Sequence, residues 1–297
     1  MPESRAGISL GLAAYVIWGS FPAFFKLVSS VPASQILVHR ILWSALFLLF
    51  FVFLTQKRSS LYNTLKEKRT ILILTVTTAF LSINWFTFLI AVTTGHVLES
   101  SLGYYINPLV SVLLGSVFFR ESLTPRQKAS IAIASAGVLV QTMMVGKIPL
   151  ISLVLAFSFG FYGMVRKSAR VESVTGLTVE MMLIFPFAAG YMIWLMSTGS
   201  AMFLRGDIVR DSFLVLSGIV TATPLILYGG ALNRLRLSTI GIMQYIVPTG
   251  HFLLAVFAFG EPFTRGHLVS FSLIWAALFL YMSESLGVFG PTVQGPV

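Results

Sequence analysis

The sequence predicts an all-α integral membrane protein with ten transmembrane helices arranged as two inverted five-helix repeats. Three observations favour this fold: the composition, a series of long apolar segments, and a repeat of one of these segments in the other half of the chain. Hydrophobic residues make up 56% of the 297 residues, charged residues make up 10%, and the mean hydropathy is +0.89. Soluble domains average roughly 45–50% apolar and 25% charged residues. The composition therefore excludes an ordinary soluble protein.

Ten apolar segments are long enough to cross a bilayer, because a helix rising 1.5 Å per residue needs about 20 residues to span it. The expected spans are 7–28, 33–54, 71–93, 97–119, 126–145, 149–167, 177–198, 212–232, 238–259 and 266–287. The longest polar connection is TQKRSSLYNTLKEKRT at 55–70. No small-residue cleavage site follows the first span, so we expect a retained helix and not a signal peptide.

The repeat joins residues 99–124 to residues 239–264 at a constant offset of 140, without a gap. Each copy contains a proline, Pro108 or Pro248, and a glutamate thirteen residues later. Since each half holds five spans, an odd number, the two copies cross the membrane in opposite directions, which is typical of secondary transporters. The predicted units are 1–146 and 147–297. A weaker match pairs Trp18-Gly19 with Tyr162-Gly163 in the first span of each half.

The basic residues orient the spans. Fourteen of the twenty lysines and arginines fall in segments on the side of the amino terminus, four fall on the other side, and Lys26 and Arg40 lie within spans. The positive-inside rule then predicts cytoplasmic termini. The net charge of +10 could indicate a nucleic-acid partner, but these residues lie in short turns and form no basic face beside stacking aromatics. We therefore expect membrane lipids and a small-molecule substrate as partners, and no nucleic acid.

Motifs for other chemistry are absent from the sequence. There is no cysteine, no P-loop, no HExxH zinc motif and no G-x-S-x-G elbow, and the four histidines are scattered along the chain. We therefore expect no cofactor, no metal and no catalytic residues, and a protein that is not an enzyme.

Charged residues within the spans are candidates for function, because a charge at the bilayer centre costs about 2.5–3.5 kcal/mol on insertion scales. Arg40 lies about two turns into 33–54, where it could hold an anionic group bidentately, or else pair with a headgroup or with Glu99. Lys26 could be functional or could reach the interface from a helix end. Glu99 and Glu180 could each sit in a first helical turn because of the helix dipole, or serve as charge partners of Arg40 or Lys26.

Polar and aromatic residues gather near the two prolines. Each proline leaves a carbonyl four residues earlier without its usual donor, which is tolerated near a cavity. The residues of this group are Asn84, Trp85, Tyr104, Tyr105, Asn107, Gln244 and Tyr245. They could line a pocket for an amphipathic molecule, or act as hydrogen-bonding and packing contacts between helices. The predicted substrate-binding residues are Arg40, Trp85, Tyr105, Asn107, Gln244 and Tyr245.

Three further residues favour structural interpretations. Glu121 and Glu261 end the two copies of the repeat, and we expect each to form a lock with neighbouring basic residues. His251 lies one turn beyond Pro248, and we interpret it as a satisfied packing histidine and not as a proton relay.

Segments along the whole chain resemble the RarD branch of the EamA family, within the drug/metabolite transporter superfamily. The matching stretches are AAYVIWGSFPAFFKL, VPASQILVHRILWS, ESSLGYYINPLVSVLLG, VRKSARVES, RLRLSTIGIMQYIVPT and WAALFLY. The resemblance implies ten helices in two inverted repeats, a bacterial inner-membrane location, and permease activity that exports small amphipathic metabolites or drugs. Proteins of this branch are described as chloramphenicol-sensitive. The alternative function is a membrane-embedded enzyme that acts on lipid-linked substrates.

Overall fold

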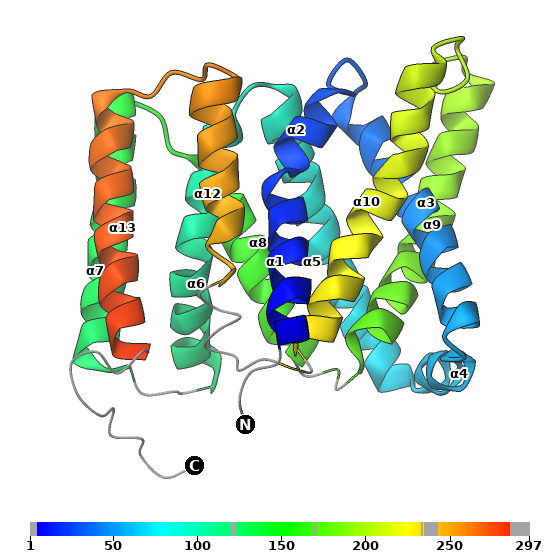
Figure 1. Ribbon diagram of the computed structural model, residues 1–297, viewed down its shortest axis with the longest axis horizontal. Coiled ribbons are helices and arrows are strands. Elements are labelled where there is room, and N and C mark those ends of the chain that lie inside the picture. Colours follow the sequence, from blue (N-terminus) through cyan, green and yellow to red (C-terminus); the bar gives the residue numbers. More distant parts are fainter. Residues whose placement is uncertain are drawn as a thin grey trace.

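The protein is a bundle of helices that run side by side, as the computed structural model shows (Figure 1). The structure describes residues 5–119, 123–167, 169, 171–232, 234 and 243–285, and these ranges contain no strand. Six helices in the described chain are long and apolar enough to cross a membrane: Arg5–Lys26, Ala33–Leu54, Lys68–Thr93, Val97–Phe118, Val174–Ser197 and Ile208–Tyr228. Shorter apolar helices cover Leu150–Arg166, Ile246–Ala258 and Arg265–Tyr281. The protein is therefore all-helical with several candidate membrane spans.

The first expected span is broken into two helices. α1 (Arg5–Gly19) is followed by α2 (Phe21–Lys26), with Ser20 between them. Pro22 lies in the first turn of α2, where a missing N–H leaves no hydrogen bond unmade.

The helices that follow match the expected spans closely at most ends. They are α3 (Ala33–Leu54), α5 (Lys68–Thr93), α6 (Val97–Phe119), α7 (Pro125–Val145) and α8 (Leu150–Lys167). The polar connection at 55–70 contains a further short helix, α4 (Arg58–Lys66). α7 begins at a capping box, in which the Thr124 hydroxyl accepts from the Gln127 N–H and the Gln127 side chain accepts from the Thr124 N–H.

Helices in the second half start earlier or later than expected. α9 (Ser173–Ser197) and α10 (Ile208–Leu232) each begin four residues before the expected span. α12 (Ile246–Leu253) continues as one π-helical turn, η1 (Leu254–Ala258), and α13 (Arg265–Ser285) follows. Pro248 thus lies in the first turn of α12, whereas Pro108 lies inside α6. Glu121 and residues 239–242 of the repeat lie outside the described residues.

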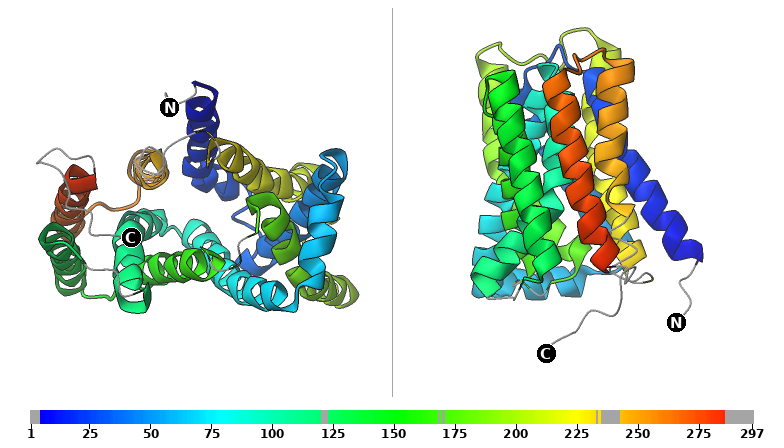
Figure 2. Two further views of the ribbon diagram at one scale, coloured as in Figure 1. Left: turned by 90° about the horizontal axis from the view of Figure 1, so that it is seen from below. Right: turned by 90° about the vertical axis from the view of Figure 1, so that its left-hand side faces the viewer.

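The helices pack as neighbours around an interior space. α10 lies against α1 and α3, α9 lies along α3, and α8 packs on both α5 and α6. Figure 2 shows the pair α7 and α13 at one end of the bundle, with α3 and α9 at the other.

Glycines bring two of these helix pairs into backbone contact. A Cβ on Gly250 of α12 would lie 2.8 Å from the Gly19 carbonyl oxygen at the end of α1. A Cβ on Gly103 of α6 would lie 2.7 Å from the Ser152 carbonyl oxygen of α8. Only glycine fits at these contacts, as is common where membrane helices cross closely.

Candidate functional site

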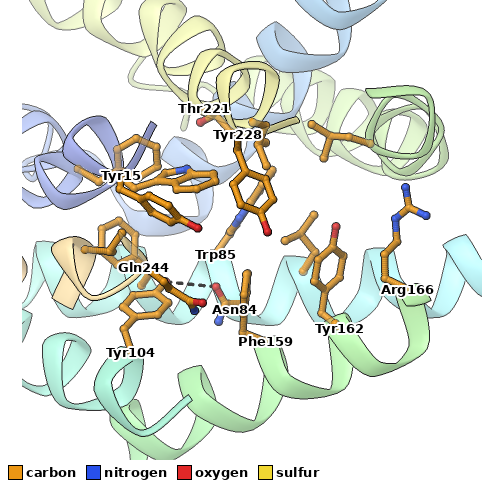
Figure 3. A pocket seen from close by; sticks show the side chains of 18 of the residues that line it. Tyr15, Asn84, Trp85, Tyr104, Phe159, Tyr162, Arg166, Thr221, Tyr228 and Gln244 are labelled. Atoms are coloured by element: carbon orange, nitrogen blue, oxygen red, sulfur yellow. Dashed lines mark hydrogen bonds between the residues drawn. The ribbon is translucent and has the colours of Figure 1, made fainter. Parts of the chain in front are cut away.

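A cavity of about 500 Å³ lies among the helices, within the range typical of small-molecule sites. Its walls come from both halves of the chain: α1, α2, α3, α5 and α6 from the first, and α8, α9, α10 and α12 from the second. Apolar and aromatic side chains make up most of the lining. Figure 3 shows how the side chains of Tyr15, Tyr104, Tyr162 and Tyr228 converge on it.

Arg40 from α3 is a buried cation in the cavity wall, only 2% exposed. Its Nε donates to Thr221 Oγ1 of α10 at 2.9 Å, and its Nη1 has no hydrogen-bond partner among the described residues. No carboxylate in the described chain forms an ion pair with it, so Glu99 is not its partner here. A buried guanidinium with an unused donor is suited to receive an anionic group.

Aromatic rings surround this guanidinium. Its Cζ atom lies 4.3 Å from the ring centroid of Trp85, 4.9 Å from that of Phe25 and 5.6 Å from that of Phe21. Cation–π contacts of this kind contribute about 0.5–2 kcal/mol each. The rings stabilise the charge without neutralising it, so Arg40 stays available for an anion.

A second arginine lines the cavity and is paired. Arg166 of α8 places its Nε 3.5 Å from Glu180 Oε1 of α9, a carboxylate that is 0% exposed. Glu180 also accepts from Thr77 Oγ1 at 2.5 Å and from the Tyr162 hydroxyl at 3.4 Å. In Figure 3, Arg166 and Tyr162 lie on the side of the pocket opposite Tyr104.

The sequence matches known proteins over nearly its full length. It is 41% identical over 284 residues to protein RarD of Escherichia coli (strain K12), which covers 96% of both chains. It is 40% identical over 282 residues to the "Uncharacterized transporter YojE" of Bacillus subtilis (strain 168), which covers 94% of both chains. Residues 5–143 match the model of the EamA-like transporter family.

The chain belongs to the EamA-like transporter family. This EamA-like protein is a RarD-like, multi-pass bacterial membrane protein, and its family makes it a membrane transporter. A solved crystal structure aligns with 97% of this chain and 100% of its own at a TM-score of 0.61 and 18% identity, which shows a shared fold. The transporter names favour transport over the membrane-embedded enzyme that the sequence left open.

Three of the six predicted binding residues lie together in this EamA-like protein. Arg40, Trp85 and Gln244 all line the cavity. Gln244 and Tyr245 lie in a turn before α12, although the sequence predicted them inside a helix.

The other three predicted residues do not line the cavity. The Tyr105 ring stacks on that of Tyr245 with 6.4 Å between centroids, and its hydroxyl lies 2.8 Å from Thr249 Oγ1. Asn107 donates to the Ala156 carbonyl oxygen at 2.9 Å and so joins α6 to α8. These contacts match the packing alternative. Successive helical residues point about 100° apart, so Tyr104 faces the cavity while Tyr105 faces away from it.

Several cavity residues were not singled out by the sequence. Tyr15, Tyr228 and Arg166 line the cavity. In the sequence, Arg166 served only as one of the basic residues that orient the spans in the membrane. The weak match between Trp18-Gly19 and Tyr162-Gly163 was a usable signal, because Trp18, Tyr162 and Gly163 are all lining residues.

The structure gives Glu180, Glu261 and Lys26 partners other than those expected, whereas Glu99 lies in the first turn of α6, as one of its two interpretations predicted. α9 begins at Ser173, so Glu180 lies two turns inside it and not in its first turn. Glu261 accepts from the Val97 and Leu98 N–H groups at 2.8 Å each and so caps α6, and it forms no ion pair with a basic side chain of the described residues. The Lys26 Nζ lies 5.4 Å from the Phe259 ring centroid, outside the cavity lining.

His251 both packs between helices and reaches the cavity wall. Its Nε2 lies 3.1 Å from the Trp18 carbonyl oxygen, and its Nδ1 lies 3.3 Å from Ser100 Oγ. The first contact satisfies a carbonyl near the break between α1 and α2. This geometry agrees with a packing histidine.

Proposed function

We propose that the protein is a permease that exports small amphipathic metabolites or drugs across the inner membrane by alternating access. The observation that carries this proposal is Arg40, a buried cation in a cavity wall without a carboxylate partner among the described residues. A substrate with an anionic group would bind the guanidinium of Arg40, whose Nη1 is buried and has no partner among the described residues, after a shift that brings this donor to the cavity surface.

The apolar part of the substrate would contact the aromatic walls. Trp85 and Tyr104 line the cavity, and Asn84 accepts from the Tyr104 hydroxyl at 3.3 Å. Flat rings against such walls gain contact area and stacking energy. The preferred substrate is therefore a small aromatic or amphipathic anion.

Alternating access is supported by the origin of the cavity walls. Lining residues come from both 1–146 and 147–297, the two units that the repeat predicts. We propose that these units are inverted five-helix repeats that give ten transmembrane helices. Rocking of one unit against the other would expose Arg40 to either side. The excess of basic residues on the side of the amino terminus supports cytoplasmic termini.

Counterflow in liposomes tests this function. Purified protein is reconstituted and loaded with single compounds from a set of aromatic amino acids, aromatic carboxylates and chloramphenicol, and uptake of the labelled compound is followed. We expect counterflow of aromatic anions by the wild type and background rates in Arg40→Gln.

Tyr105→Phe is the matched control, because it removes one hydroxyl of the predicted set that lies outside the cavity. Its counterflow should stay within about twofold of that of the wild type, since only a lining hydroxyl contributes to binding. Wild-type rates in folded Arg40→Gln protein would contradict the role of Arg40, and no counterflow of any compound would contradict the permease.

A further inference from the structure

The pair of Arg166 and Glu180 forms a second charged group beside the cavity, apart from the contact proposed at Arg40. The side chain of Arg166 is 14% exposed and lines the cavity, whereas Glu180 is 0% exposed and is not a lining residue. A carboxyl group removed from water stays ionised only while cations and donors hold it, and otherwise takes up a proton. Arg166 therefore has an anionic partner only while Glu180 is ionised.

The hydroxyl of Thr77 can serve Glu180 in both protonation states. Thr77 Oγ1 lies 2.5 Å from Glu180 Oε1 and 3.0 Å from the Leu74 carbonyl oxygen. An ionised Glu180 accepts the single hydroxyl proton of Thr77. A protonated Glu180 instead donates to Thr77 Oγ1, and Thr77 then donates to the Leu74 carbonyl. Neither protonation state leaves a buried hydrogen-bonding proton without an acceptor, so the surroundings of Glu180 are compatible with both states.

The charged and titratable groups that face Glu180 are few. Arg166 and Tyr162 come from α8, and Thr77 from α5 contributes only a hydroxyl. On α3 and α4, which pack with α9, the Arg40 and Arg58 guanidinium groups lie over the rings of Trp85 and Phe53. In the described parts of α3, α4, α5 and α10, no basic side chain forms an ion pair with Glu180.

Arg166 is held by a second hydrogen bond and by its packing, and neither depends on Glu180. Its Nη2 lies 3.4 Å from the Glu172 carbonyl oxygen. Its guanidinium lies directly against Gly176 of α9, where any Cβ would overlap it. Loss of the Glu180 charge would therefore leave a positioned cation at the cavity wall.

We propose that Glu180 is a proton-binding site linked to anion binding in the cavity. Uptake of a proton by Glu180 releases Arg166, which then joins Arg40 in holding the anion. This inference rests on the proposed function. Linkage is reciprocal, so an anion that prefers the protonated protein also draws a proton onto it. Proton and anion then leave the cell together, and the gradient of the accumulated anion drives export.

Binding of benzenesulfonate to the purified protein tests this linkage. Benzenesulfonate stays ionised from acidic to alkaline buffer, so any pH dependence belongs to the protein. In the wild type we expect the affinity to rise by up to about tenfold per pH unit as the pH falls through the range in which Glu180 takes up its proton. Binding should also remove up to one proton per protein from a weakly buffered solution.

Glu180→Gln is the decisive variant, because the amide keeps the shape of the side chain without the charge. It should bind benzenesulfonate in alkaline buffer as tightly as the wild type does in acidic buffer, with no proton uptake. Glu67→Gln is the matched control, since Glu67 is exposed before α5, and it should behave as the wild type.

Each outcome decides between the proposals. Binding by the wild type that is the same at every pH, without proton uptake, would overturn the proton site and leave the permease standing. No binding at any pH would overturn both this inference and the anion site at Arg40. If Glu180→Gln does not fold, the wild type alone decides. Its infrared difference spectrum on binding benzenesulfonate should gain the carbonyl band of a protonated carboxylic acid, and an unchanged carboxylate signal would overturn the proposal.

Discussion

Arg40 and Arg166 line the same cavity but hold their charges in different ways. Arg40 is surrounded by three aromatic rings and one hydroxyl, and no carboxylate pairs with it among the described residues. Arg166 pairs with the buried carboxylate of Glu180. A buried cation without a counter-ion is available to a ligand, whereas a paired cation becomes available only when its partner is neutralised.

The two arrangements also differ in what each arginine leaves behind when it is removed. Around Arg40 remain rings and the Thr221 hydroxyl, which bear no charge. Beside Arg166 remains a carboxylate that water cannot reach. Loss of one partner from a buried ion pair is strongly destabilising, because the other charge stays uncompensated. Substitutions at the two sites should therefore separate stability from binding.

The largest effect on stability is expected from Arg166→Gln. In alkaline buffer, where Glu180 is ionised, this change should lower the free energy of unfolding by about 3–5 kcal/mol. Thermal unfolding in detergent measures it as a lower Tm. Adding Glu180→Gln to the same chain should restore most of the loss. A single variant as stable as the wild type would show that the pair contributes nothing to folding.

Arg40→Gln should affect binding far more than stability. Loss of a charge-assisted contact of about 1.5–3 kcal/mol lowers the affinity for an aromatic anion by roughly 10- to 150-fold. The Tm should change less than in Arg166→Gln, because no buried charge loses its partner. Benzenesulfonate titrations and thermal unfolding of the same samples measure both quantities. A large loss of Tm with unchanged affinity would mean that Arg40 stabilises the fold and does not bind the anion.

A smaller effect is expected from Trp85→Leu, which removes the ring nearest the Arg40 guanidinium. The loss of a cation–π contact and of a stacking surface should weaken anion binding by roughly 2- to 30-fold. Trp275→Leu is the control, because that indole packs against Tyr105 and Phe271 outside the cavity lining. Equal losses of affinity in the two variants would mean that the Trp85 ring contributes nothing specific to anion binding at Arg40.

The smallest effect on transport should come from Tyr105→Phe. The change removes the hydroxyl contact with Thr249 and lowers stability by about 0.5–1.5 kcal/mol, without touching the cavity. Tyr104→Phe on the neighbouring helical face removes a hydroxyl that bonds Asn84 in the cavity wall. Counterflow rates should fall in Tyr104→Phe and stay within about twofold of the wild type in Tyr105→Phe, since only a lining hydroxyl contributes to binding. The reverse order would place the binding face of α6 on the side of Tyr105.

Much of the helical pattern followed from the sequence alone. Apolar length placed α3 at its observed bounds and the start of α7 within one residue, and the capping box of Thr124 and Gln127 explains where α7 begins. Helix starts that carry polar residues were harder to place. α9 takes in SVTG before its apolar run, and Val174, Thr175 and Gly176 of this stretch are buried in the bundle.

Only part of the candidate site could be predicted from the sequence. Arg40 stood out because a charge in an apolar segment is expensive. The repeat aligns Tyr105 with Tyr245, and both were predicted to bind substrate. In the structure their rings stack on each other outside the cavity lining. A match between repeats marks corresponding positions and does not say which face of a helix they occupy. That face is set by rotation and packing of the helices, which also brought Arg166 into the cavity wall.

The most direct test of the role of Arg40 is the preference of the purified protein for benzenesulfonate over benzenesulfonamide. The two compounds share a ring and nearly the same shape, but only the sulfonate is charged near neutral pH. In mildly alkaline buffer, where Glu180 is ionised and pairs with Arg166, we expect the wild type to prefer the sulfonate by about tenfold or more. In the same buffer Arg40→Gln should bind both compounds equally weakly. An undiminished preference for the sulfonate in Arg40→Gln would contradict Arg40 as the anion-binding group.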